Sequence, residues 1–332
     1  MSKLFAIAFI IVLCACVAPN SDQVRSYLDY PEAGIKTGGV KMVPIIVDSD
    51  TFKVWTKRFG NNPKMKVLLL HGGPGGTHEQ LECFESFFPK EGIEFYEYDQ
   101  LGSYYSDQPE DTTLWQIDRM VGEVEQVRKY LGLGKDNFYI LGHSWGGMLA
   151  MQYALKHQDN LKGLIVCNMF SSARNQNAYI NEILTSINSP AVAELAALDE
   201  KKDFDNPRYF ELLFETLYKG RGLRLESIPE PMARAMKHHN PVPDRVILGK
   251  SALRLGGQLE TVEIFDALEN ITIPTLIVAG KHDFINPKHL EDMSRKVPNG
   301  EFVLCPNGSH NAMWDDQETF MNGVVSFIKK WQ

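Results

Sequence analysis

Cysteine is scarce in this 332-residue chain, and no two cysteines stand in the C-x-x-C spacing of a metal or redox site. Cys14 and Cys16 lie close to the N-terminus, which leaves Cys83, Cys167 and Cys305, an odd number. Cys167 and Cys305 fall in apolar runs, where a free thiol behaves as a small hydrophobic side chain. We therefore expect Cys167 and Cys305 to be buried small hydrophobic residues and not a disulfide.

Long blocks of charge of one sign are also absent. The formal net charge of −8 is spread along the chain, so the basic patch that nucleic-acid binding needs is missing. The adjacent pair His238-His239 has no accompanying ligand pattern, and we interpret both as solvated residues and not as part of a metal site. We expect no nucleic-acid partner and no metal.

The N-terminal apolar stretch is too short to span a bilayer comfortably. The stretch from Leu4 to Leu13 follows Lys3 and has the length of a signal-peptide core. Leu13-Cys14-Ala15-Cys16 resembles the lipobox of bacterial lipoproteins, with cleavage before Cys16 and lipidation of its thiol. We expect a lipoprotein signal peptide at 1–15, a tether at 16–38 and a lipid anchor in the membrane of the bacterial cell envelope. A plain secretory signal, giving a periplasmic or secreted protein, is the alternative.

Beyond the tether, apolar runs alternate with helical stretches. Helical periodicity is clearest from Leu114 to Leu131, where apolar positions share one face. This alternation predicts an α/β fold with a mostly parallel, doubly wound sheet covered by helices on both faces. Strands are expected at 40–47 and 51–59, as an edge hairpin, and at 66–70, 93–98, 138–142, 163–168, 274–279 and 301–305.

The alternation stops between 170 and 262. This stretch contains repeated prolines and no convincing strand. We expect it to be an inserted helical cap over the carboxyl ends of the strands, with the sheet core formed by 39–169 and 263–332. A cap in that position would shape the substrate pocket and exclude water from it.

Ser144 stands between two glycines directly after an apolar run. The sequence Gly142-His143-Ser144-Trp145-Gly146 follows Phe138–Leu141, which is the strand, sharp turn and helix context of a nucleophile elbow. The glycines let strand and helix approach closely while the serine takes a strained conformation. Its hydroxyl would then lie at a helix N-terminus, where negative charge is favoured. An ordinary strand-to-helix turn is the alternative interpretation.

A glycine-rich segment follows the strand predicted at 66–70. In His71-Gly72-Gly73-Pro74-Gly75-Gly76 the amide of Gly73 is a candidate oxyanion donor, with the amide of Trp145 as the second donor. A phosphate-binding loop is the competing interpretation. It is disfavoured because the segment has neither a G-x-G-x-x-G pattern nor a closing Lys-Ser/Thr pair.

A polar side chain follows each of two later predicted strands. Asp283 follows the strand at 274–279, and His310 follows the strand at 301–305, so the chain order is serine, acid, histidine. A serine hydroxyl needs a base to become a nucleophile, and the acid orients that base. We therefore predict a triad of Ser144, Asp283 and His310, with His282 as the rival base.

Several motifs together resemble a known family, the α/β-hydrolase serine peptidases of the proline iminopeptidase (prolyl aminopeptidase) type. They are His71-Gly72-Gly73-Pro74-Gly75, Asp99-Gln100-Leu101-Gly102-Ser103, Gly142-His143-Ser144-Trp145-Gly146-Gly147, Gly280-Lys281-His282-Asp283 and Gly308-Ser309-His310. The resemblance implies the α/β-hydrolase fold, with the same serine, acid and histidine as the triad and the same two oxyanion amides. It also implies no metal and no organic cofactor.

Members of that family hold the free α-amine of a peptide with acidic cap residues. A buried ammonium needs a carboxylate partner, and such a partner selects the amino end of a peptide. The resemblance points to Glu211 and Glu215 in the cap as candidates. Where relatives carry a second acid, this chain has Ala252.

The function expected from these features is that of an exported serine aminopeptidase. It would release an N-terminal residue, with proline as a candidate, from short peptides through an acyl-enzyme. A carboxylesterase or amidase that acts on small acyl substrates with the same triad is the alternative, and the departure at Ala252 favours it. A non-catalytic binding lipoprotein is disfavoured because every triad role is filled. The oligomeric state is left open.

Overall fold

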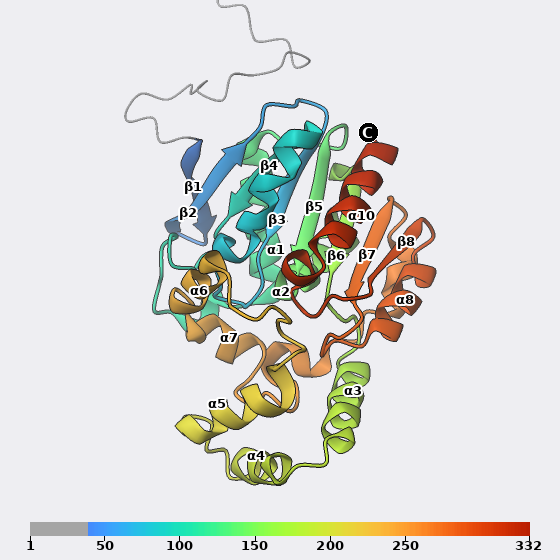
Figure 1. Cartoon of the computed structure of the whole chain (residues 1–332). Coiled ribbons are helices and arrows are strands. Elements are labelled where there is room, and N and C mark those ends of the chain that lie inside the picture. The colour runs from blue at the N-terminus through green and yellow to red at the C-terminus, as the bar shows by residue number, and fades with distance from the viewer. Residues whose placement is uncertain (1–38) are drawn as a thin grey trace, which may run out of the picture.

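The structure is a computed structural model that describes residues 39–332. The predicted signal peptide (1–15), the tether (16–38) and the lipidation site Cys16 lie outside the described residues. Within 39–332, no helix is both long and apolar enough to cross a membrane. The strands, labelled in Figure 1, are β1 (Val40–Val47), β2 (Asp50–Phe59), β3 (Lys66–Leu70), β4 (Glu94–Tyr98), β5 (Phe138–His143), β6 (Gly163–Cys167), β7 (Thr275–Gly280) and β8 (Gly300–Cys305).

These eight strands form one sheet in the order β1-β2-β4-β3-β5-β6-β7-β8. β3 to β8 run parallel to one another. β1 and β2 form an antiparallel hairpin that joins the sheet through β4. The predicted mostly parallel α/β sheet is confirmed, and each predicted strand agrees with the observed one to within one residue at either end.

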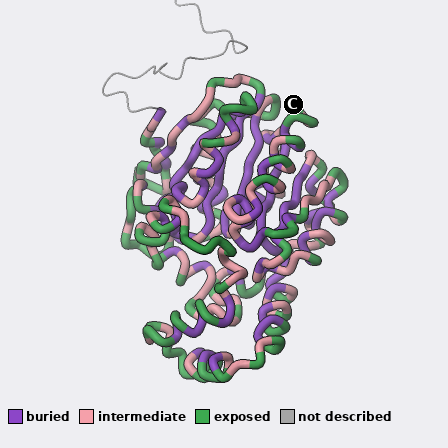
Figure 2. Tube along the Cα trace, viewed as in Figure 1, coloured by how far each residue is buried: buried purple, intermediate pink, exposed green. Residues whose placement is uncertain are grey.

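Successive side chains of the central strands point to opposite faces, and each face has its own helical layer. Leu68 and Ile140 pack with one layer, whereas Val67 and Leu141 pack with the other. The first layer contains α1 (Ile117–Leu131), α2 (Trp145–His157) and α8 (Pro287–Lys296); the second contains η1 (His78–Ser86), η2 (Phe88–Glu91), α9 (Ala312–Asp315) and α10 (Gln317–Lys330). Both faces are therefore buried, which explains the continuous apolar strands (Figure 2).

Helix α1 begins three residues later than its apolar periodicity predicts. A separate 3-10 turn, η3 (Thr112–Leu114), precedes it and is capped by Asp111. Trp115 is fully buried between the turn and the helix, and the Gln258 amide bonds the backbone on both sides of the break, at Trp115 and Ile117. Burial of the indole thus overrides helical propensity at this point.

The segment between β6 and β7 is helical and lies below the carboxyl edge of the sheet in Figure 1. Helices α3, α4 and α5 share a hydrophobic cluster of their own, separate from the two clusters of the sheet. At the root of the cap, an isolated antiparallel bridge joins Ser172 to Glu263. The elements are α3 (Ala173–Ser186), α4 (Pro190–Glu200), α5 (Pro207–Leu213), the π-helix η5 (Phe214–Tyr218), α6 (Glu230–Lys237), α7 (Pro241–Ile247), η6 (Gly257–Thr261) and η7 (Asp266–Asn270).

The turn between β5 and α2 is compressed against β3. A Cβ added at Gly142 would overlap the backbone of Gly146, and a Cβ added at Gly146 would overlap the carbonyl oxygen of Leu70. Only residues without a side chain fit these two positions, so the G-x-S-x-G pattern reflects a steric requirement of the packed backbone.

We expect Gly146→Ala to destabilise the protein by about 3 kcal/mol or more, because backbone cannot yield to the new methyl group as a side chain would. Gly122→Ala in α1 is the matched control. Nothing lies within 4 Å of its added Cβ, so alanine should stabilise the helix by about 0.5–1 kcal/mol. Thermal unfolding of both variants measures the contrast, and equal melting temperatures would contradict the packing described above.

Candidate active site

Ser144 occupies the strained position of the turn. Its backbone has φ 53° and ψ −126°, outside the regions that residues with a side chain normally adopt, and it caps α2. Its amide donates to the carbonyl of Cys167, at 3.0 Å, which ties the turn to the end of β6. Ser144 lines a cavity of about 470 Å³ between the sheet and the cap.

Asp283 and His310 meet at the carboxyl edge of the sheet, after β7 and β8. Asp283 Oδ1 lies 2.9 Å from His310 Nδ1, and the aspartate is 1% exposed. Its Oδ2 accepts a hydrogen bond of 2.7 Å from Asn168 Nδ2. Because Nδ1 faces the carboxylate, Nε2 is the ring nitrogen left to act on another group.

His310 lies beside His143, the residue before Ser144, with ring centroids 5.0 Å apart. The Phe284 ring lines the same cavity as Ser144 and stacks on the His310 ring, with ring centroids 4.2 Å apart. His143, the neighbour of Ser144, lies with Nε2 2.8 Å from the His310 carbonyl oxygen. A carbonyl oxygen can only accept, so His143 carries its proton on Nε2, and burial lowers its pKa to about 3. His143 is therefore a neutral donor that fixes the His310 backbone.

His282, the rival base, does not contact the Ser144 cavity. It lines a second cavity, next to Lys281. Burial, Arg224 and Lys281 together lower its pKa. The aspartate that follows it hydrogen-bonds His310 instead.

Gly73 and Trp145 both line the cavity beside Ser144. Gly73 has φ 117°, in the region that favours glycine, and a Cβ there would lie 2.6 Å from the Gly76 nitrogen. Trp145 is the first residue of α2, so its amide has no partner within the helix. The structure thus brings both predicted oxyanion donors to the serine.

A buried hydrogen-bond network joins the segment of Gly73 to the turn of Ser144. Gln100 Nε2 donates to the His71 carbonyl oxygen at 3.1 Å, and Gln100 Oε1 accepts from Trp145 Nε1 at 2.8 Å. Ser103 Oγ lies 3.2 Å from His71 Nε2. Burial lowers the pKa of His71 against the opposing field of Asp99. The motif Asp99-Gln100-Leu101-Gly102-Ser103 therefore positions the two candidate donors relative to each other.

His238 corrects our interpretation of the histidine pair as solvated. Its Nδ1 lies 2.9 Å from the carboxylate of Glu79, which is fully buried, and its ring stacks on Tyr104 at 3.9 Å. Arg234, on α6, lies 3.3 Å from the same carboxylate. A buried acid in η1 thus holds the cap helix α6 against the core, a contact between segments that are distant in sequence. His239 is half-buried, 3.7 Å from Asp244.

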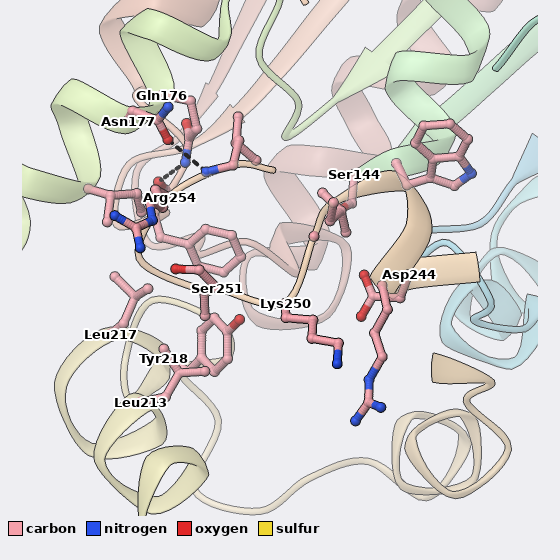
Figure 3. Close-up of a pocket in the computed structure, with 18 of the residues that line it drawn as sticks. Ser144, Gln176, Asn177, Leu213, Leu217, Tyr218, Asp244, Lys250, Ser251 and Arg254 are labelled. Carbon is pink, nitrogen blue, oxygen red and sulfur yellow. Dashed lines mark hydrogen bonds between the residues drawn. The ribbon is translucent and has the colours of Figure 1, made fainter. Parts of the chain in front are cut away.

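Glu211 and Glu215 do not line the Ser144 cavity. Both are exposed, and Glu211 pairs with Arg208 at 3.2 Å on the outer surface of the cap. The apolar residues of the same stretch, Leu213 and Leu217 among them, face the cavity instead (Figure 3). The helical period of this stretch turns its acidic side chains outward.

Asp244 is the carboxylate that does line this cavity. It lies in the first turn of α7, and 35% of its side chain is exposed, so a ligand can reach it. Burial raises its pKa to about 6, against the opposing effect of Arg245. Figure 3 shows Asp244 and Lys250 on the same side of the cavity, below Ser144. From the sequence, Asp244 could only be interpreted as a helix-capping acid.

Two arginines of the cavity, Arg254 and Arg245, are paired with carboxylates outside its lining, whereas no salt bridge is formed by Lys250 among residues 39–332. Arg254 lies 3.3 Å from Asp199, and Arg245 lies 2.8 Å from Asp205. Among residues 39–332, no three His, Cys, Asp or Glu side chains are grouped so that they could hold a metal ion. Cys167 and Cys305 are buried free thiols, as predicted, and Cys83 is a buried free thiol as well.

Comparison with known proteins places this site in a family. A family model described as the alpha/beta hydrolase fold matches residues 66–317. A proline iminopeptidase of Flavobacterium johnsoniae is 55% identical over 288 residues, which is 86% of this chain and 97% of that protein. The chain belongs to the proline iminopeptidase family of α/β hydrolases. A second relative, the proline iminopeptidase of Elizabethkingia meningoseptica, is 53% identical over 290 residues, 87% of this chain and 97% of that protein.

Solved structures agree on the fold. VinJ superposes with a TM-score of 0.81 at 23% identity, over 88% of this chain and 99% of its own. A proline iminopeptidase of Mycobacterium smegmatis superposes with a TM-score of 0.78 at 24% identity, over 88% of this chain and 98% of its own. Membership of the family makes the protein a serine hydrolase with aminopeptidase function.

Proposed function

We propose that the protein is an exported aminopeptidase that releases an N-terminal residue, with proline as the leading candidate, from short peptides through an acyl-enzyme. The observation that carries the proposal is the carboxylate of Asp244 in the cavity of Ser144. An enzyme that needs a free amino end requires such an anion beside its nucleophile. The names of the relatives in Flavobacterium and Elizabethkingia support proline as the released residue.

In this proposal His310 takes the proton of the Ser144 hydroxyl as the oxygen attacks the scissile carbonyl. The amides of Gly73 and Trp145 stabilise the oxyanion, and His310, held by Asp283, then gives its proton to the leaving amine. In the second step His310 removes a proton from a water molecule as the water oxygen bonds to the acyl carbon. The bond between that carbon and Ser144 Oγ then breaks, His310 returns the proton to Oγ, and the amino acid is released.

Asp244 replaces Glu211 and Glu215 as the proposed partner of the substrate ammonium. Apolar side chains, including Phe284 and Ile285, form the cavity wall. Such a wall suits the ring of an N-terminal proline, whose only charge is its secondary ammonium.

Replacement of the nucleophile tests the chemistry. We expect Ser144→Ala to lower kcat by about 10⁴- to 10⁶-fold, because the nucleophile is lost while binding groups stay in place. The melting temperature should stay near that of the wild type, because the variant keeps its Cβ and backbone. Steady-state kinetics and labelling with a serine-directed phosphonate provide the measurements. A variant that is still labelled at the wild-type rate would disprove the assignment.

Replacement of Asp244 tests the amine site. Asp244→Asn should raise KM for a free-amine substrate by about 10- to 100-fold, the value of one charge-assisted hydrogen bond. A simple acyl ester should be nearly unaffected. Glu211→Gln and Glu215→Gln, on the outer surface, are the matched controls and should behave like the wild type on both substrates. Equal losses on amine and ester substrates would contradict the role of Asp244.

The pH dependence has a defined sign. With a pKa of about 6, Asp244 is ionised above pH 6 and becomes protonated below it. KM for the free-amine substrate should therefore rise as the pH falls through 6, whereas KM for the ester should not. In Asp244→Asn, this difference between the two substrates should disappear.

Export is the remaining part of the proposal, and it rests on the N-terminal sequence alone. If Cys16 carries a lipid, Cys16→Ser should move the enzyme out of the membrane fraction. Cys14→Ser, a change two residues away, should leave the enzyme in the membrane fraction. Cell fractionation of both variants tests this, and a wild-type protein found in the soluble fraction would rule out the anchor.

A further inference from the structure

A second cavity, also of about 470 Å³, is lined by Asp283 and shares no lining residue with the cavity of Ser144. Helix α3, the loop that follows η5 and the loop that follows β7 form its walls. Four cationic side chains line it against two carboxylates, those of Glu182 and Asp283. The four cations are Lys219, Arg221, Arg224 and Lys281.

The four cations of this cavity outnumber the carboxylates near them, which are Glu182, Asp283 and Asp315, the last of which accepts the Arg224 amide at 2.9 Å. Within the part of the chain that the structure describes, the salt bridges include none from these four side chains, whereas Arg128, Arg208 and Arg295 each face a carboxylate. The Asp283 carboxylate is bonded to His310 and Asn168 and is therefore not paired with any of the four cations. In a chain with a net charge of −8, a concave site with unpaired cations is unusual.

Two of these cations, Arg224 and Lys281, also act on the ring of His282. His282 lines the same cavity, and Arg224 and Lys281 add to burial in lowering its pKa. Both cations therefore lie close enough to this ring for their charges to disfavour its protonated form. Like charges held together repel, and a bound anion relieves that repulsion.

We propose that this cavity is a binding site for a polyvalent oxyanion, of which inorganic phosphate is the simplest case. Guanidinium groups bind tetrahedral oxyanions through two parallel N–H donors, and ammonium groups add charge. Two arginines and two lysines offer more N–H donors than the two oxygens of a monovalent carboxylate can use, whereas a tetrahedral oxyanion can accept from several of them. The site is independent of which residue the enzyme releases.

The position of the cavity couples it to the catalytic side chains. The carbonyl oxygen of Arg221 accepts the amide of His310 at 2.7 Å, and that of Gly222 accepts the amide of Asn311 at 3.2 Å. An anion held between Arg221 and Lys281 fastens the loop 219–224 to the loop that carries Asp283. The ligand therefore stabilises the segment on which the His310 backbone rests.

Thermal unfolding of the full mature chain in sodium phosphate, against sodium chloride at the same ionic strength, tests the proposal. We expect a saturable rise in melting temperature that chloride and acetate do not reproduce. At a hundredfold excess over the dissociation constant, the shift should be about 5 °C. Broadening of the ³¹P resonance of phosphate provides a direct measure of binding.

The double variant Lys219→Gln/Lys281→Gln should weaken phosphate binding at least tenfold. Both side chains are exposed, so the fold should be retained. If the double variant does not fold, Arg224→Gln carries the same expectation. The matched control, Lys90→Gln/Lys135→Gln, removes the same charge from η2 and from the loop before β5, and it should bind phosphate like the wild type.

Three results would overturn the proposal. The first is a phosphate effect no larger than that of chloride. The second is an equal effect in the Lys219/Lys281 double variant and the wild type. The third is competitive inhibition by phosphate that Lys250→Gln abolishes and the double variant retains, because this would place the anion in the cavity of Ser144.

Discussion

The close contact between β3, β5 and the start of α2 is the constraint on which the rest of the structure depends. Gly142 and Gly146 let the turn close, and Ser144 is held in a strained conformation between them. That conformation presents its hydroxyl to the cavity and leaves the amide of Trp145 free of the helix ladder. The Gln100 network then sets the Gly73 segment against this turn. Strain of about 1–3 kcal/mol persists because packing on every side determines the backbone.

The sheet edge and the cap contribute different things to the site. Ser144, Asp283 and His310 come from the ends of parallel strands, where loop positions are fixed by the buried core. The cap supplies the apolar wall and Asp244. Among the contacts that bind the cap to the core, the buried Glu79 pairs with Arg234 of α6, and the carbonyl oxygen of Arg221 accepts the His310 amide. Changes in the cap can therefore reach the catalytic side chains through hydrogen bonds as well as through the substrate.

Strand positions, the chain order of the three polar side chains and the glycine-rich segments could be predicted because they follow from local patterns: apolar runs, and glycines where backbones touch. The start of α1 was predicted three residues early because the burial of Trp115 is a tertiary effect. Glu211 and Glu215 were predicted because the resembling family holds the substrate amine with acidic cap residues, but which face of a short helix turns inward depends on packing. Asp244, Asn168 and the Glu79–His238 pair join segments that are distant in sequence, and no local signal marks them.

The central claim is that a carboxylate in the cavity selects a free amino end. Hydrolysis of proline arylamide beside acetyl-proline arylamide, at pH 7.5 with the soluble form lacking residues 1–16, tests this claim most directly. We predict turnover of the free amine and rejection of the acetylated compound, because acetylation removes the charge that Asp244 would bind. Equal turnover of both, or turnover of a short acyl ester alone, would contradict the claim and indicate an esterase or amidase on the same scaffold.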